Sequence, residues 1–250
     1  MNTTDKILRV VAPLAVFATL GWMLAYGVGG YTGSLIEGAA VTVVLALLAL
    51  ALATTLGLLA AWAKIAGGRI LRALANTYTV IIRGVPDLVM ILLIYYGGQR
   101  LVNQIATGLG FEPLDVSPFL AGLFAIGFIY GAYLAETFRG AWLGIPRGQI
   151  DAGKALGLPT MVSFRKVLMP QLLRSVLTGY ANVWQVLVKS TAVVSVIGLN
   201  DLVGLADKIG KSTREPFLFL VVVMLFYLSM TIISEKGFKY LEHRSDRWAS

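Results

Sequence analysis

Six apolar stretches, most of them about twenty residues or longer, succeed one another along this 250-residue chain. They cover residues 8–28, 38–63, 76–98, 119–138, 176–197 and 217–233. A helix needs roughly 20 apolar residues to cross the hydrocarbon core of a bilayer. Hydrophobic residues make up 57% of the chain and charged residues only 14%. The pattern therefore predicts an all-α, polytopic helical membrane protein and excludes an ordinary soluble domain.

Positive charge gathers in every second connection between these stretches. Basic residues lie in the short connection that begins at Lys64, crowd residues 139–174 and recur in the C-terminal tail. The connections at 100–115 and 201–215 carry a net charge near zero or below. With six spans, all basic connections fall on one side, which the positive-inside rule identifies as the cytoplasm. We therefore expect both termini in the cytoplasm, and topology rather than a nucleic-acid partner explains the net charge of +8.

Few residues of the chain suit catalysis or metal binding. Cysteine is absent, which excludes a disulfide, a thiolate metal site and a cysteine nucleophile. The single histidine, His243, lies in the polar tail, and Gly210-Lys-Ser-Thr213 lacks the upstream glycine of a phosphate loop. We expect no catalytic residue, no metal site and no cofactor bound by this chain. The first apolar stretch lacks a clear cleavage site, so a retained helix is favoured over a cleaved signal peptide.

A polar, glycine-bounded segment at residues 148–157 stands out in this apolar chain. It is expected to form a short helix, because Gly157 suits the left-handed position at a helix end and Pro159 prevents continuation. Pro170 is expected to end the basic and apolar run that follows. The small residues Ala152, Gly153 and Ala155 would let another protein approach the backbone closely. A docking element and a helix lying on the membrane surface both fit this pattern.

Ionisable residues occur deep inside the third and the fifth predicted spans. Arg83 and Asp87 flank Gly84 and Pro86, which weaken the helix between them, and Lys189 lies within the fifth span. Such groups are costly in a membrane and mark a mutual pair, a site or a path. One interpretation is that Arg83 or Lys189 neutralises Asp87 and holds helices together; a gating role is another. The third is a substrate path, with the following candidate residues: Arg83, Asp87, Tyr95, Gln185 and Lys189.

The fourth span carries two further patterns. Gly122, Gly127, Gly131 and Ala135 recur at roughly helical spacing, which predicts close helix packing on one face. Glu136 lies three residues before Arg139, so an ion pair at the helix end is favoured over a substrate ligand.

These motifs together resemble the permeases of ATP-binding-cassette importers. The segment 148–157 with Pro170 is similar to the coupling loop of that family, with Asp151 in place of glutamate and Gly153 in place of alanine. Further similar motifs belong to polar-amino-acid permeases, closest to the Q-type subunit of histidine, lysine-arginine-ornithine and opine importers. These motifs are Ile82-Arg-Gly-Val-Pro-Asp-Leu88, Phe128-Ile-Tyr-Gly-Ala-Tyr133, Glu136-Thr-Phe-Arg-Gly-Ala141, Lys189-Ser-Thr-Ala192 and Glu215-Pro-Phe217. The resemblance covers about residues 35–240.

The resemblance implies a five-helix importer-permease core with one extra N-terminal transmembrane helix. Residues 1–34 would hold the extra helix, 35–240 the permease with its coupling loop at about 140–174, and 241–250 a cytoplasmic tail. The coupling loop would enter a cleft of the ATPase subunit. The residues assigned to it are Gly148, Gln149, Asp151, Ala152, Gly153, Ala155, Leu156, Gly157 and Pro170.

The implied function is a permease subunit in the bacterial inner membrane that forms the path for cationic amino acids or opines. The implied partners are an M-type permease, two copies of an ATP-binding-cassette ATPase and a periplasmic substrate-binding protein. These ATPases, rather than this chain, would use ATP. The binding protein would contact residues 101–117, expected to include a short surface helix, and residues 200–215. The alternatives are an ion or proton channel subunit and an ion-coupled secondary amino-acid carrier.

Overall fold

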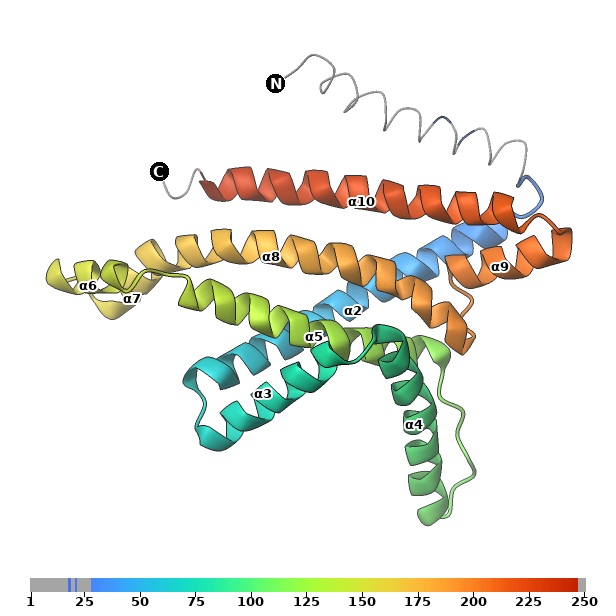
Figure 1. Ribbon diagram of the computed structural model, residues 1–250, viewed down its shortest axis with the longest axis horizontal. Helices are drawn as coiled ribbons and strands as arrows, with labels where there is room; N and C mark the ends of the chain where they lie inside the picture. Colours follow the sequence, from blue (N-terminus) through green and yellow to red (C-terminus); the bar gives the residue numbers. More distant parts are fainter. Residues whose placement is uncertain (1–17, 19–20, 22–27, 247–250) are drawn as a thin grey trace. The chain divides into compact units, whose positions relative to one another are not determined.

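Every element is a helix in the residues that the structure, a computed structural model, describes, which are 18, 21 and 28–246 (Figure 1). The predicted span at 8–28, and with it most of the predicted segment 1–34, lies outside the described residues. The elements in chain order are α2 (Thr32–Ala66), α3 (Arg69–Gly84), α4 (Asp87–Gly108), α5 (Pro118–Leu143), α6 (Arg147–Ala155), α7 (Thr160–Ser163), the π-helix η1 (Phe164–Leu168), α8 (Met169–Ser190), the 3-10 helix η2 (Thr191–Ile197), α9 (Leu202–Thr213) and α10 (Pro216–Asp246).

The apolar lengths of these helices fit a polytopic membrane protein. Four helical segments of the described chain are long and apolar enough to cross a membrane: Thr32–Ala66, Pro118–Leu143, Met161–Ile197 and Pro216–Arg244. The pair α3 and α4 supplies a fifth span if the two helices are counted as one. The predicted fold class, an all-α polytopic membrane protein, is confirmed.

The third predicted span is broken in the middle. α3 ends at Gly84, α4 begins at Asp87, and the two helices are bent by 113° at this break. Val85 has an extended backbone with φ −110° and ψ 139°, which is the conformation that a following proline imposes. Pro86 also lacks a backbone N–H and excludes the helical carbonyl four residues earlier. The prediction of one helix over 76–98 is therefore wrong.

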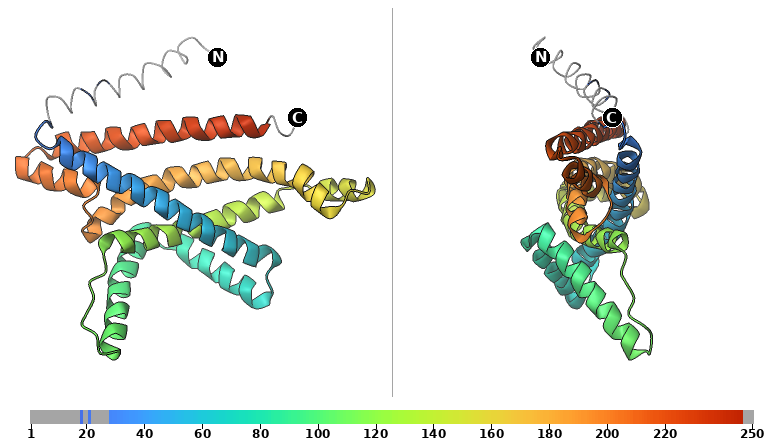
Figure 2. Two further views of the ribbon diagram at one scale, coloured as in Figure 1. Left: turned by 180° about the vertical axis from the view of Figure 1, so that it is seen from behind. Right: turned by 90° about the vertical axis from the view of Figure 1, so that its right-hand side faces the viewer.

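The connection after the third span differs from the predicted short surface helix at 101–117. α4 itself continues to Gly108, and the following residues run back alongside it as an extended segment (Figure 2). Side chains of α4 hold that segment by its backbone. Asn103 Oδ1 accepts a hydrogen bond from Leu114 N at 2.9 Å, and Gln99 Oε1 accepts one from Val116 N at 2.7 Å.

The helix contacts divide the chain into two compact units, each assembled from three separate segments. The first unit comprises residues 1–47, 91–123 and 188–234. Its core gathers buried side chains from the turn before α2, from the start of α2, from α9 and from α10, namely Val28, Leu35, Leu202, Ala206, Ile209, Phe219, Val222 and Val223. Asp201, which is fully buried, caps α9 by accepting a hydrogen bond from Gly204 N at 2.9 Å.

The second unit comprises residues 48–90, 124–187 and 235–250. Glycines bring α2 and α5 close together in it, as the small-residue pattern predicted. A Cβ atom on Gly57 would lie 2.7 Å from Leu134 Cβ, and one on Gly127 would lie 2.6 Å from Leu52. Gly131 is equally tight, because a Cβ atom there would lie 2.8 Å from the Tyr78 hydroxyl. Close backbone approach of this kind stabilises helix pairs in lipid.

Pro170 does not end the run that precedes it, contrary to the prediction. α7, η1 and α8 follow one another without a gap from Thr160 to Ser190. Proline normally disrupts a helix by removing an N–H donor and clashing with the carbonyl four residues before. The wider turn of η1, at 164–168, ends two residues before Pro170, and such π-turns are found where a regular α-helical ladder is interrupted.

Candidate functional site

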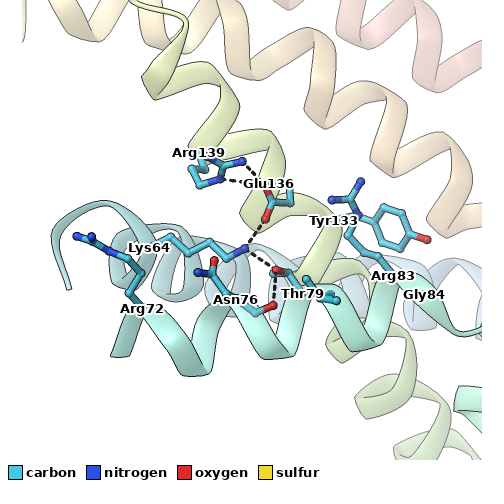
Figure 3. Close-up of a pocket in the computed structure, with 10 residues that line it drawn as sticks. Lys64, Arg72, Asn76, Thr79, Arg83, Gly84, Tyr133, Glu136 and Arg139 are labelled. Atoms are coloured by element: carbon cyan, nitrogen blue, oxygen red, sulfur yellow. Dashed lines mark hydrogen bonds and ion pairs between the residues drawn. The ribbon is translucent and has the colours of Figure 1, made fainter. Parts of the chain in front are cut away.

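A polar cavity of about 760 Å³ lies along α3 in the second unit (Figure 3). We call it the α3 cavity. Its lining residues come from the end of α2, from α3 and from α5: Lys64, Arg72, Asn76, Thr79, Val80, Arg83, Gly84, Tyr133, Glu136 and Arg139. The cavity reaches Gly84, the last residue of α3, so it extends to the break in the third span.

The α3 side of this cavity is a polar stripe. Arg72, Asn76, Thr79 and Arg83 are separated by four, three and four residues, which places them on one face of a helix. Away from this stripe α3 exposes large apolar side chains such as Ile70, Leu74 and Ile81. α3 is thus suited to face lipid or protein on one side and water or a polar ligand on the other.

An ion-pair cluster closes one part of the α3 cavity. Lys64 Nζ donates hydrogen bonds to Glu136 Oε1 and Thr79 Oγ1. Arg139 contacts the other carboxylate oxygen, Glu136 Oε2, at 2.9 Å from Nε and 2.8 Å from Nη2. The Lys64 side chain is only 5% exposed. The Lys64 ammonium therefore joins α2 to both α3 and α5, and the predicted Glu136–Arg139 pair is confirmed.

Two tyrosines of α5 hold the ionisable residues beside the helix break. The Arg83 guanidinium lies over the Tyr133 ring, with Cζ 5.4 Å from the ring centroid, a cation–π contact. Tyr130 donates its hydroxyl to Asp87 Oδ2 at 2.7 Å. The two tyrosine rings stack on one another at 5.6 Å. Arg83 and Asp87, both predicted from the sequence, are thus held on either side of the break by adjacent rings.

The other three candidate path residues lie elsewhere. Gln185 belongs to the second unit but lines a smaller cavity of about 170 Å³, which shares no residue with the α3 cavity. Tyr95 and Lys189 belong to the first unit. Tyr95 packs its ring 5.1 Å from that of Tyr96, and Lys189 is exposed. Of the five candidates, the described contacts bring only Arg83 and Asp87 into one region.

The predicted short helix at 148–157 is present as α6, and it ends as predicted. Gly157 adopts a left-handed backbone with φ +67°, and Leu158 N donates to Gly153 O at 3.0 Å. This bond is the six-to-one bond of a Schellman motif. Most of the segment is exposed, including Gly148, Gln149, Asp151, Ala155 and Leu156, whereas Pro170 is half-buried.

Gly153 is buried, in contrast to the exposed residues of the segment named above. A Cβ atom there would lie 2.6 Å from Ser163 Oγ, so the absence of a side chain lets α6 pack on α7 within this chain. The side chain of Ala152, another residue assigned to the coupling loop, lies outside what the structure describes.

Several residues of the α3 cavity were missed by the sequence interpretation, notably Lys64, Thr79 and Tyr133. The sequence placed Lys64 only in a basic connection expected on the cytoplasmic side. A detectable signal was the four-three-four spacing of polar residues along α3. Among the described residues, no group of three or more histidine, cysteine, aspartate or glutamate side chains is arranged to hold a metal ion.

Long apolar helices, a broken span and a polar cavity lined by ionisable groups define a membrane protein of the transport class. Residues 53–246 match the family model of the binding-protein-dependent transport system inner membrane component. The chain belongs to this family. It is therefore an inner-membrane permease subunit of an importer rather than an enzyme.

Individual relatives support this assignment. The histidine/lysine/arginine/ornithine transport system permease protein HisQ of Salmonella typhimurium is 45% identical over 215 residues, covering 86% of this chain and 94% of HisQ. The octopine transport system permease protein OccQ of Rhizobium meliloti is 36% identical over 226 residues, covering 90% and 95%. The crystal structure of an amino acid ABC transporter with histidines matches with a TM-score of 0.75 and 31% identity, covering 87% and 97% of the two chains.

Proposed function

We propose that this permease subunit forms part of the path for basic amino acids, or for opines derived from them, in an ATP-driven importer. The observation that carries the substrate class is the 45% identity to the histidine/lysine/arginine/ornithine permease over 86% of the chain. The octopine permease, at 36% identity, supports the same class, because octopine is an arginine derivative.

The proposed complex contains a second, M-type permease, two ATP-binding-cassette ATPases and a periplasmic binding protein. ATP is used by the ATPases, and this chain binds no cofactor of its own. Both termini lie in the cytoplasm, which the one-sided placement of the basic connections supports. The proposed division follows the resemblance: a segment at 1–34 assigned to an additional span, a permease core at 35–240 and a tail at 241–250.

The substrate path on this chain centres on the break between α3 and α4. Arg83 and Asp87 are its proposed ionisable groups, with the α3 cavity leading away from the break. Ionisable side chains within a membrane segment are costly unless they serve a partner or a path, and this pair is held by tyrosine rings and a hydroxyl. Tyr95, Gln185 and Lys189 remain proposed path residues on the strength of sequence alone.

Coupling to the ATPases is assigned to α6 and its flanks. The exposure of Gln149, Asp151 and Leu156, with Leu156 78% exposed, supports this role. The Schellman motif at the end of α6 fixes the direction in which the backbone continues toward α7. ATP-driven closure of the ATPases would move α6 and, through the continuous helix from Thr160 to Ser190, the membrane helices.

The coupling role is tested by Asp151→Arg, with Asp151→Glu as the matched control. Asp151 is exposed, so neither change disturbs packing within the segment. We expect the arginine variant to lose most arginine uptake in proteoliposomes supplied with ATP and binding protein, while the glutamate variant retains it. Both proteins should insert and purify equally. Equal uptake by the two variants would contradict docking through α6.

A further inference from the structure

The α3 cavity carries an excess of positive charge. Its lining includes four basic side chains, Lys64, Arg72, Arg83 and Arg139, and one acidic side chain, Glu136. Three positive charges are therefore left over within a cavity of about 760 Å³. A cavity charged in this way attracts anionic groups and opposes cationic ones.

The acidic side chain is already neutralised by its neighbours. Glu136 accepts hydrogen bonds from Lys64 at one oxygen and from Arg139 at the other. The Glu136 side chain is only 20% exposed. A cationic substrate side chain would have to displace a tethered cation to reach it. Glu136 is therefore poorly placed to recognise the basic end of an amino acid.

Arg83 offers the opposite chemistry. Among the described residues, no carboxylate lies within ion-pair distance of its guanidinium, and the group is exposed where it lines the cavity. The Tyr133 ring supports one face of the guanidinium, which leaves the N–H edge available. A planar guanidinium presents a fork of donors that matches a carboxylate.

We infer that the α3 cavity binds the transported amino acid by its α-carboxylate, with Arg83 as the contact residue. The inference rests on the proposed function, since it names the part of the substrate that this site recognises. The carboxylate is shared by histidine, lysine, arginine, ornithine and the opines. This cavity therefore accepts the whole class and does not discriminate among its basic side chains, so that selection is made at other contacts.

The first arm of the test uses substrate analogues on the wild-type complex. The complex is placed in nanodiscs of phosphatidylcholine, a zwitterionic lipid, without the binding protein, so that the binding protein's own amino-acid site is absent. Radiolabelled arginine is displaced by agmatine, which lacks the carboxylate, or by norvaline, which lacks the guanidinium. We expect agmatine to bind about 10- to 100-fold more weakly than arginine, which is the range for the loss of one charge-assisted contact. Norvaline should show a smaller decrease in affinity relative to arginine.

The second arm uses Arg83→Gln, with Arg69→Gln as the matched control. Arg69 lies on the same helix, is exposed and does not line the cavity. Arg83→Gln should weaken arginine binding about 10-fold or more and leave agmatine binding unchanged, whereas Arg69→Gln should change neither. Because the analogue arm needs no variant, a misfolded Arg83→Gln protein does not leave the inference untested.

The outcomes separate the two levels of inference. If agmatine binds as tightly as arginine, or if Arg83→Gln weakens both ligands equally, carboxylate recognition by Arg83 is wrong while the importer function stands. If the wild-type complex with ATP and binding protein imports no basic amino acid or opine, the proposed function itself is wrong, and the inference falls with it.

Discussion

At the scale of single residues, Asp201 shows how burial controls a titration. Its carboxylate caps α9 yet is fully buried, and no described residue donates a hydrogen bond to Oδ2. Burial raises the pKa of Asp201 from 3.8 to about 6, and backbone amides at the helix start only partly oppose this rise. The folded protein therefore holds a proton here that the unfolded chain has already released.

The predicted consequence is that Asp201 makes folding less favourable as the pH rises. The folded pKa exceeds the unfolded one, so the folded state binds more protons between about pH 4 and pH 6, and stability falls across that window by up to about 3 kcal/mol. Asp201→Asn keeps the acceptor for Gly204 N but cannot ionise. Melting temperatures at pH 4.5 and pH 7.5 should show a smaller decrease for the variant; identical decreases would contradict the assignment.

Gly57 illustrates a second residue-scale requirement, close backbone contact. A Cβ atom there would meet Leu134 Cβ at 2.7 Å and the backbone of Gly131 and Ala135 at 3.2 Å. We expect Gly57→Ala to destabilise the protein by about 1–3 kcal/mol through overpacking. Gly140→Ala meets nothing within 4 Å and should be neutral or stabilising by up to about 1 kcal/mol. Unfolding in mixed detergent would measure the free energy of unfolding of both variants. Equal changes in the two variants would contradict the close contact between Gly57 and Leu134.

At the scale of helices, the Lys64–Glu136 cluster ties three elements together. Lys64 loses its carboxylate partner in Glu136→Gln and remains buried, whereas Lys64→Met leaves Glu136 with Arg139 at 2.8 Å. We therefore expect Glu136→Gln to cost more stability than Lys64→Met, on the order of 3–5 kcal/mol for an orphaned buried charge. The double variant should recover part of the loss. A strictly additive double-mutant cycle would show that the pair is not coupled.

The helices also show what sequence patterns predict. Apolar length predicted the spans of α2, α5, α8 and α10, and the glycine at a left-handed position predicted the end of α6. Pro86 and Gly84 indicated a weakened third span, but the 113° bend depends on how the two halves pack. The π-turn before Pro170 was not foreseen, since proline alone predicts a helix end.

The candidate site was only partly predictable as well, because some of its contacts are local in sequence and others depend on packing between helices. The Glu136–Arg139 pair follows from three-residue spacing on one helix. Lys64 and Glu136 are 72 residues apart, so their pairing depends on tertiary packing that one sequence does not display. Arg83 and Asp87 were found because charges are rare in a membrane span. Tyr133, whose ring lies under the Arg83 guanidinium, carries no such signal.

At the scale of the whole molecule, membership of the importer-permease family relates the broken third span to the exposed helix α6. The third span is broken and its first half, α3, carries a polar stripe within an apolar protein. In the proposed function, the exposed helix α6 is the point at which the ATPases attach. The polar stripe would also suit a channel or a carrier driven by an ion gradient, but in either of these α6 would have no partner. The account therefore requires transport that depends on other proteins.

The most direct measurement is uptake of radiolabelled arginine and histidine into proteoliposomes that contain the complete complex. ATP on the ATPase side and binding protein on the opposite side are supplied separately and together. The account predicts uptake only when both are present, with no response to a proton or sodium gradient. Uptake driven by an ion gradient without ATP, or in the absence of the ATPases, would contradict the central claim.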